Sequence, residues 1–278
     1  MKRIDLHNHT SCSDGTDSPA ELISAAKAAG LAAIAITDHD TVEGIPEAAK
    51  AGESLGVEVV PGVEMCTGFE HTEIHTLGYF IDTGNERLKN ALKWVIDDRR
   101  ERNEKMAAAM RADGLPVTAE ELYARYPHST LGRPHFGEKL IELGVVASVK
   151  ESFEKYLNPG CKYYVRRHFI EFSEAVSVIH AAGGRAVLAH PFQYKYDDER
   201  LRHLLDFCAE AGMDGMECMY SGYTPEMQEY LMRLAGEYGL LITGGSDYHG
   251  YHKPHIKIGT GISGELNVPY ELLEKLRR

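Results

Sequence analysis

The sequence contains no uninterrupted apolar stretch of about 20 residues, the length that a membrane-spanning helix requires. Its first residues, MKRIDLH, include no apolar segment of the kind found in secretory signal peptides. The five cysteines are scattered and form no CxxC pair, which predicts free thiols rather than a disulfide framework. We therefore expect a cytoplasmic globular protein that does not associate with membranes.

The chain also lacks an overall positive charge, because its net charge is −12. This disfavours a broad groove for long duplex nucleic acid. The charge is unevenly distributed along the chain. Residues 85–168 contain 16 basic residues (Lys and Arg) and 12 acidic residues (Asp and Glu), whereas the rest of the chain contains 14 basic and 30 acidic residues. The acidic part could hold cations and the basic part could meet an anionic substrate, although ordinary solvated surface is the alternative.

Outside 85–168, short apolar runs alternate with helical patterns. The runs that predict strands are 3–6, 31–37, 57–64, 73–80, 185–190, 215–219 and 240–247. The helical patterns lie at 19–29, 44–55, 171–182, 197–211 and 225–238. This alternation predicts an α/β fold of parallel strands with helices outside, and at least seven strands favour a closed or nearly closed barrel.

Residues 85–168 interrupt this alternation. Helical patterns lie at 85–112, 118–125, 133–143 and 149–157, with few strand signals between them. We expect one discontinuous barrel domain formed by 1–84 and 169–278. The segment 85–168 would then be a helical insertion that covers the mouth of the barrel.

Histidines and acidic residues end or follow five of the predicted strands, and the strand at 73–80 contains a histidine. They are His7, His9, Asp38, His39, Glu64, His75, His190, Asp247 and His249. The carboxyl ends of parallel barrel strands meet at one rim, where catalytic residues gather. Alternate residues of an extended segment point the same way, so His7 and His9 could hold one ion together. A single histidine at a strand end is more often structural, but six at one rim predict a polynuclear metal site.

The chemistry of these side chains indicates hydrolysis. Mixed imidazole and carboxylate ligands suit Zn²⁺, Mn²⁺ or Fe²⁺, and no cysteine takes part in the pattern. Paired cations about 3.5–4 Å apart activate a water and neutralise the charge of a phosphoryl group. Phosphate esters fit best, and hydrolysis of an amide or lactone is the neighbouring alternative.

The motifs resemble those of the PHP family, the polymerase and histidinol phosphatase family of metal-dependent phosphoesterases. The matching pieces, in chain order, are DLHNHTSCSDG, AITDHDTVEG, VVPGVEM, EIHTLGY, AVLAHP and GSDYHG. Two further pieces, TLGRPHFGEKLIELG and FEKYLNPGCKYYV, resemble a branch that includes nucleoside 3′,5′-bisphosphate phosphatases and 5′-exonucleases acting on short RNA. The resemblance implies a distorted (β/α)₇ TIM-like barrel with two or three divalent ions, Mn²⁺, Zn²⁺ or Fe²⁺.

The resemblance also implies ligands for three ions. The first ion would be held by His7, His9, Glu64 and Asp247. Glu64 would bridge to a second ion held by His75 and His190. The third would be held by Asp14, His39 and His249, although Asp14 in SDG could instead be a turn residue. Catalysis is assigned to His190, Asp247 and Glu64, with His190 or a metal-bound water protonating the leaving oxygen.

Five residues of 85–168 are candidates for substrate binding. They are Arg133, His135, Lys162, Tyr163 and Arg166. The Arg133 guanidinium could grip a phosphate with two hydrogen bonds, and Tyr163 could stack on a base. The alternatives are a surface or capping role for Arg133, a structural role for His135 and ordinary packing for Tyr163. The sequence departs from the branch in having Arg166-Arg167-His168 after Tyr-Val, and Gln193 where a basic residue is common.

These observations predict an enzyme, a phosphoesterase that releases phosphate from a small nucleotide through a metal-activated hydroxide. The alternatives are a 5′-to-3′ exonuclease on short oligoribonucleotides, a histidinol-phosphate-type phosphatase and a non-catalytic metal-stabilised module. The module is disfavoured because no strand-end ligand is missing. The expected partner is a small phosphorylated nucleotide or short RNA end, with no long duplex, membrane or obligate protein partner.

Overall fold

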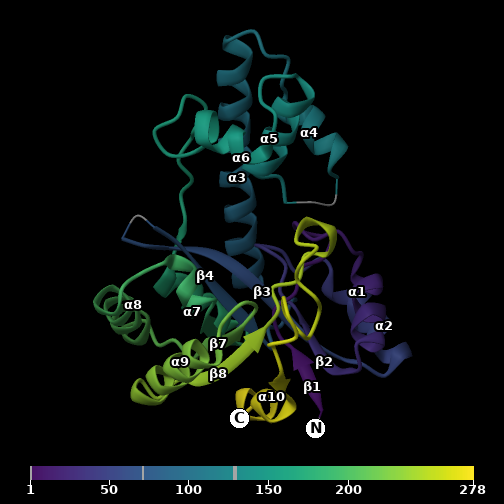
Figure 1. The fold of residues 1–278 in the computed structure, drawn as a ribbon, viewed down its shortest axis with the longest axis vertical. Helices are drawn as coiled ribbons and strands as arrows, with labels where there is room; N and C mark the ends of the chain where they lie inside the picture. Colours follow the sequence, from purple (N-terminus) through teal and green to yellow (C-terminus); the bar gives the residue numbers. More distant parts are fainter. Residues whose placement is uncertain (1, 71, 128–129) are drawn as a thin grey trace. The chain divides into compact units, whose positions relative to one another are not determined.

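The computed structural model describes residues 2–70, 72–127 and 130–278 and divides into two compact units (Figure 1). The barrel unit comprises the chain up to Leu92 together with Phe169–Arg278. The helical unit comprises Lys93–His168. Among the described residues, no helix is both long enough and apolar enough to cross a membrane.

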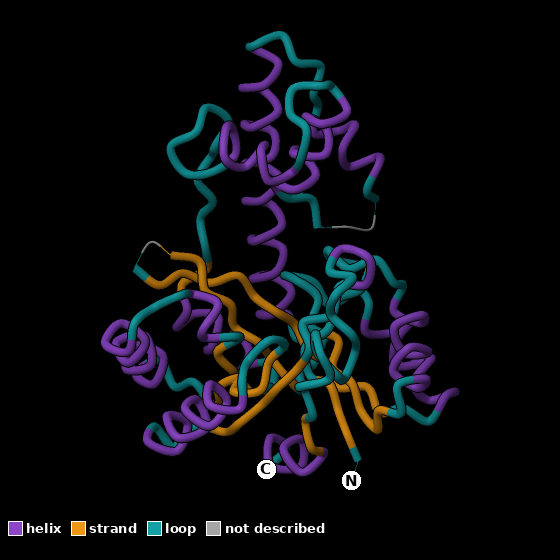
Figure 2. The backbone as a smooth tube through the Cα atoms, in the orientation of Figure 1, coloured by secondary structure: helices purple, strands orange, loops and turns teal. Residues whose placement is uncertain are grey.

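One curved sheet forms the centre of the barrel unit, as the strands in Figure 2 show. Its strands are β1 (Arg3–Asp5), β2 (Leu31–Ile36), β3 (Glu58–Phe69), β4 (Thr72–Tyr79), β6 (Arg185–Leu188), β7 (Gly215–Tyr220), β8 (Leu241–Gly245) and β9 (Val268–Pro269). They lie in the order β8-β7-β6-β4-β3-β2-β1-β9, and β5 (Ile170–Glu171) pairs with β3. Leu6 N donates to Gly244 O at 3.1 Å, which joins the segments of β1 and β8. The predicted α/β class is confirmed, with a nearly closed barrel-like sheet.

The prediction of parallel strands throughout is wrong for β4, which runs antiparallel to both β3 and β6. The physical reason is the length of its connection. Only residues 70–71 separate β3 from β4, and a parallel crossover needs a dozen or more residues. β3 also continues to Phe69, so Glu64 lies within a strand rather than at its end, whereas His75 lies within β4 as predicted for its strand.

Helices cover the outside of the barrel unit (Figure 1). They are α1 (Pro19–Ala28), α2 (Ile45–Leu55), α7 (Phe172–Ala181), α8 (Asp198–Glu210), α9 (Pro225–Glu237) and α10 (Tyr270–Leu276). The Ser18 side chain accepts from Glu21 N while the Glu21 carboxylate accepts from Ser18 N, so a capping box starts α1.

Both faces of β2 are buried, as expected for a strand between a barrel interior and covering helices. Ala33 and Ala35 pack with Leu77 of β4 and Val187 of β6. Ile34 and Ile36 instead pack in the cluster that includes Leu22, Ile23 and Ala48 of the covering helices. The period of two along the strand therefore separates the two packed layers.

The helical unit has its own hydrophobic core. Helix α3 (Glu86–Ala112) begins in the barrel unit and continues into the helical unit. It is followed by α4 (Ala119–Arg125), α5 (Arg133–Glu142), α6 (Val149–Ser152) and a π-helical turn (Phe153–Leu157). Its core includes Met106, Met110, Leu122, Phe136 and Leu140. These elements are the helices that the sequence predicts for this stretch.

Candidate metal centre

His7 and His9, which follow β1, point their Nε2 atoms at the same carboxylates. Each Nε2 lies 3.2 Å from Glu64 Oε2. Asp247 Oδ1 lies 3.6 Å from His7 Nε2 and 3.3 Å from His9 Nε2. The structure therefore brings together the four side chains predicted for the first ion.

The second carboxylate oxygen of Glu64 faces a different pair of imidazoles. His75 Nδ1 lies 2.9 Å from Glu64 Oε1, and His190 Nε2 lies 3.1 Å from it. The two ring nitrogens are 3.2 Å apart. Glu64 thus presents one oxygen to each set of histidines, the arrangement that a carboxylate bridging two cations requires.

Asp14, in the loop after His9, reaches the third predicted set. Its Oδ1 lies 3.3 Å from His249 Nε2 and 3.5 Å from His9 Nδ1. Its Oδ2 lies 3.8 Å from His39 Nε2. The loop therefore returns a carboxylate to the rim, and His9 contacts both the first and the third sets.

The chemistry of these donors fits divalent metal ions. His7 Nε2 and His9 Nε2 are buried, and among the described atoms neither has a hydrogen-bond partner of acceptable geometry. Leaving buried ring nitrogens without a partner is costly, and a bound cation would supply one once the rings are neutral. All nine residues predicted as ligands fall into groups whose ligand atoms lie within 4.8 Å of one another. The side chains thus form clusters able to bind metal.

Two of these residues have strained backbones. His190 has a φ of 29° and Asp247 a φ of 56°, in the left-handed region that non-glycine residues rarely occupy. Such conformations cost about 1–3 kcal/mol each and cluster at functional sites. The strain is held by hydrogen bonds from His190 N to Glu217 Oε2 and from Asp247 N to His7 O, both 2.8 Å.

Glu217 of β7 is a site residue that the sequence interpretation missed. Its fully buried carboxylate accepts from His7 Nδ1 at 3.0 Å and from His190 N at 2.8 Å. A carboxylate on the second ring nitrogen fixes the tautomer and orientation of a metal-binding histidine. The available signal was a single acidic residue inside the otherwise apolar strand GMECM.

Other buried side chains hold the loops that carry the candidate ligands. Asp38 accepts from Thr10 N at 2.7 Å and from Ser13 Oγ at 2.6 Å, which fixes the turn after His9. Asp247 Oδ2 accepts from Tyr220 Oη at 2.6 Å and from Lys253 Nζ at 2.7 Å. The other oxygen of Asp247 is therefore left to face the histidines.

One cysteine, which the pattern of strand ends did not include, lies beside this cluster. Cys66 Sγ lies 3.9 Å from His39 Nδ1, and Cys66 forms a potential ligand group with His39 and His75. The pattern omitted Cys66 because the third predicted strand ended at Glu64. Because β3 continues, Cys66 projects from the same face as Glu64, two residues further on.

The five predicted substrate residues all lie in the helical unit. Arg133 is the first residue of α5, where its guanidinium lies over the rings of Phe153 and Tyr164 and donates to Leu157 O at 3.4 Å. His135 is buried, and its Nδ1 accepts from Gly132 N at 3.0 Å, in a capping interaction at the start of α5.

Tyr163 lies in the core of the helical unit, where it stacks on Tyr156 and donates to Asp113 at 2.6 Å. Burial and this carboxylate raise the pKa of Tyr163 to about 12. Lys162 is exposed and pairs with Asp113 at 2.5 Å, and Arg166 is exposed. These positions favour packing over base stacking for Tyr163.

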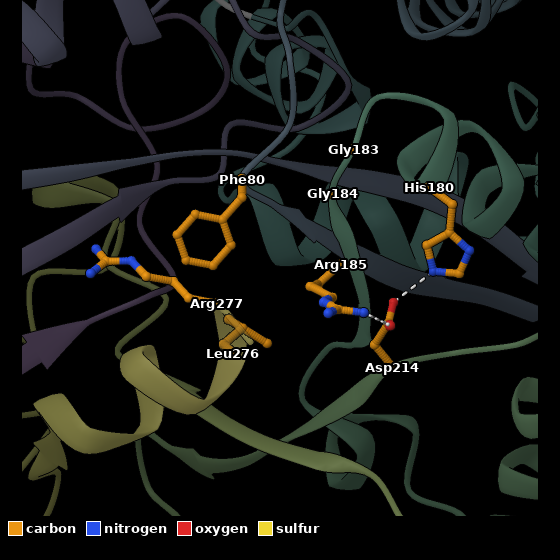
Figure 3. A pocket seen from close by; sticks show the side chains of 8 residues that line it. All are labelled: Phe80, His180, Gly183, Gly184, Arg185, Asp214, Leu276 and Arg277. Carbon is orange, nitrogen blue, oxygen red and sulfur yellow. Dashed lines mark hydrogen bonds and ion pairs between the residues drawn. The ribbon is translucent and has the colours of Figure 1, made fainter.

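A separate hollow in the barrel unit contains none of the predicted site residues (Figure 3). It is lined by Phe80, His180, Gly183, Gly184, Arg185, Asp214, Leu276 and Arg277. Arg185 begins β6 and Asp214 precedes β7, so the hollow lies at the opposite strand ends from His190. Asp214 pairs with Arg185 at 2.9 Å and with His180 at 2.7 Å, which is typical of a structural role.

The candidate ligands differ in how tightly they hold protons. Although burial opposes it, Glu217 and Glu64 raise the pKa of His7 well above its usual value. In the same way Glu64 and Asp14 raise the pKa of His39 to about 10. Burial lowers the pKa of His190 and, together with His9, that of His249.

Metal binding should therefore release protons at neutral pH. His7 and His39 are protonated in the metal-free protein and must become neutral to bind an ion, so apparent affinity should rise with pH. The expected slope is about tenfold per pH unit for each proton released. Calorimetric titration in buffers of different protonation enthalpy would count the protons. An affinity independent of pH between about 6 and 9 would contradict the prediction.

Comparison with known proteins agrees with this geometry. Residues 5–219 match the PHP domain family. A 5′-3′ exoribonuclease of Haemophilus influenzae is 34% identical over 249 residues, covering 89% of this chain and 90% of the relative. A 3′,5′-nucleoside bisphosphate phosphatase of Chromobacterium violaceum is 34% identical over 251 residues, covering 90% of this chain and 88% of the relative. A solved structure from Bifidobacterium adolescentis, assigned as a metal-dependent phosphoesterase, has a TM-score of 0.83 and 31% identity, covering 99% of this chain and 95% of that one. With its six motifs and clustered ligands, the chain belongs to the PHP family.

Proposed function

We propose that this protein is a metal-dependent phosphoesterase that hydrolyses a terminal phosphate ester of a small nucleotide. The observation that supports this best is the position of Glu64. Its two oxygens face separate sets of imidazoles at 2.9–3.2 Å, as a carboxylate shared by two cations would. Two or three divalent ions at the predicted positions, with Mn²⁺, Zn²⁺ or Fe²⁺ as candidates, are part of the proposal.

When bound, the ions would lower the pKa of water and neutralise the charge of the phosphoryl group. The side chains prepare the site for this role. Glu217 orients His7 so that Nε2 faces Glu64, and Lys253 and Tyr220 hold Asp247. His190 is suited to be a neutral ligand, because its lowered pKa disfavours the protonated form that a proton donor to the leaving oxygen would need.

The proposed substrate class can be tested by measuring phosphate and mononucleotide release with Mn²⁺ from four compounds. They are adenosine 3′,5′-bisphosphate, AMP, histidinol phosphate and a 5′-phosphorylated trinucleotide. Preferential release of phosphate from the bisphosphate would support the proposal. Absence of turnover on all four, with metal bound, would reject the substrate class.

A second candidate function is 5′-to-3′ exonuclease action on short RNA. It is favoured by the exoribonuclease relative, whose identity to this chain equals that of the bisphosphate phosphatase. Stepwise release of mononucleotides from the trinucleotide would establish it in preference to the first.

We further propose that Arg133 of the helical unit binds a second phosphate of the substrate. Its guanidinium is held in place by the rings of Phe153 and Tyr164 and by a hydrogen bond to Leu157 O. The Arg133 side chain therefore loses less conformational entropy when it binds a phosphate. Arg133→Met should raise the KM for the bisphosphate by about 10- to 100-fold, the loss of a charge-assisted hydrogen bond. AMP should be affected much less in steady-state assays.

Arg125→Met is the matched control, because Arg125 is an exposed arginine of the same unit paired with Glu142. It should leave both KM values unchanged. If Arg133→Met raised the KM for AMP and for the bisphosphate by the same factor, Arg133 would not recognise the second phosphate.

A further inference from the structure

Cys66 is a neighbour of three candidate metal ligands, each of which reaches it from a different part of the fold. On β3 it is two residues from Glu64, so both side chains leave the same face of the strand. On β4, His75 is its direct cross-strand partner in the antiparallel register. From the loop after β2, His39 presents Nδ1 3.9 Å from Cys66 Sγ.

Glu64 completes this set of donors. Its Oε2 lies 3.2 Å from His39 Nδ1 and its Oε1 lies 2.9 Å from His75 Nδ1. The ligand atoms of His39, Cys66 and His75 lie within 4.8 Å of one another, and the Glu64 carboxylate contacts both imidazoles. Among the groups of potential ligands in the described part of the chain, Cys66 is the only cysteine.

The separation of Cys66 Sγ and His39 Nδ1, 3.9 Å, is close to the spacing of two donors around a tetrahedral ion. Zn–S bonds of about 2.3 Å and Zn–N bonds of about 2.0–2.1 Å place N and S about 3.5 Å apart, a few tenths of an ångström less than observed here. Cys66 is 3% exposed, and its backbone N donates to Asp40 Oδ1 at 2.9 Å, which fixes its position. The His39 and His75 side chains are 16% and 22% exposed, so solvent reaches part of both imidazoles.

We propose that Cys66 is a metal ligand in this protein, together with His39, His75 and Glu64. Thiolate is a soft donor that favours Zn²⁺ over Mn²⁺ or Mg²⁺. Cys66 would therefore make this position selective for a thiophilic cation. A neutral imidazole has only one ring lone pair, so binding this ion through Nδ1 withdraws His39 from the set that contains Asp14 and His75 from the set that contains His190.

The inference rests on the metal centre of the proposed function, and cobalt substitution tests the two separately. The metal-free full-length protein is titrated with Co²⁺, and bound cobalt is measured by elemental analysis. Sulfur-to-cobalt charge transfer is recorded in the near ultraviolet. The wild type should show this band, and Cys66→Ser should lose it completely while still binding cobalt. Cys66→Ala, which places no hydroxyl in the buried position, provides a second test if the serine variant folds poorly.

Cys161→Ser is the matched control, because Cys161 lies in the helical unit, where its thiol donates to Glu154 O. It should keep the band. Cobalt bound to the wild type without the band, or a band that persists in Cys66→Ser, would overturn the role of Cys66 and leave the metal centre intact. Failure of the wild type to bind cobalt would overturn both the role of Cys66 and the proposed metal centre.

Discussion

Replacing Glu64 with glutamine is expected to reduce phosphate release by more than about 100-fold and to lower the amount of bound metal. Removing a residue that only supports a ligand already costs 10- to 100-fold in related sites, and a bridging carboxylate should cost more. Glu64 is within 3.2 Å of five imidazoles, those of His7, His9, His39, His75 and His190. An amide keeps the shape but replaces one coordinating oxygen with an NH₂ group that cannot bind a cation.

Metal content and turnover of this variant should be measured on the same samples. Glu58→Gln is the matched control, because Glu58 begins the same strand and accepts a hydrogen bond from Tyr270 at 2.6 Å. It should retain metal and activity. Normal turnover by Glu64→Gln would place the reaction outside this centre.

The ligands could be predicted from the sequence because local periodicity determines where they point. The HxH motif uses the alternation of an extended segment, and the order of strands brings the motifs to one rim. Where this reasoning misplaced residues, the cause was non-local. β3 continues beyond Glu64 because it pairs with β4 as far as Phe69, and that pairing leaves no mark in the local apolar pattern.

Residues outside the pattern of strand ends were harder to find. Glu217 is 210 residues from His7 in the sequence, and their contact depends on how β7 and β1 are arranged in the barrel. Cys66 becomes a neighbour of His75 only through the reversed direction of β4. In the helical unit, by contrast, His135 lies three residues from Gly132 and caps α5, so the structural alternative was accessible from spacing alone.

Glu217→Gln is expected to weaken metal binding by about 10- to 100-fold, the usual cost of losing a carboxylate behind a ligating histidine. Glu217 accepts two hydrogen bonds, from His7 Nδ1 and from His190 N. A glutamine side chain has one accepting oxygen, so its NH₂ group must face one of the two donors. Either the His7 ring turns or the strained backbone at His190 loses its support.

The affinity can be measured by competition with a chelating dye, and the exposed Glu171 of β5 offers a control as Glu171→Gln. Turnover provides the sharper comparison. Because Glu217 positions a ligand without being one, excess metal should restore most of the activity of Glu217→Gln. Excess metal should not restore the activity of Glu64→Gln, because that variant lacks the bridging oxygen. Equal failure of both variants at saturating metal would mean that Glu217 takes a direct part in the reaction, and full activity at limiting metal would mean that His7 needs no orienting partner.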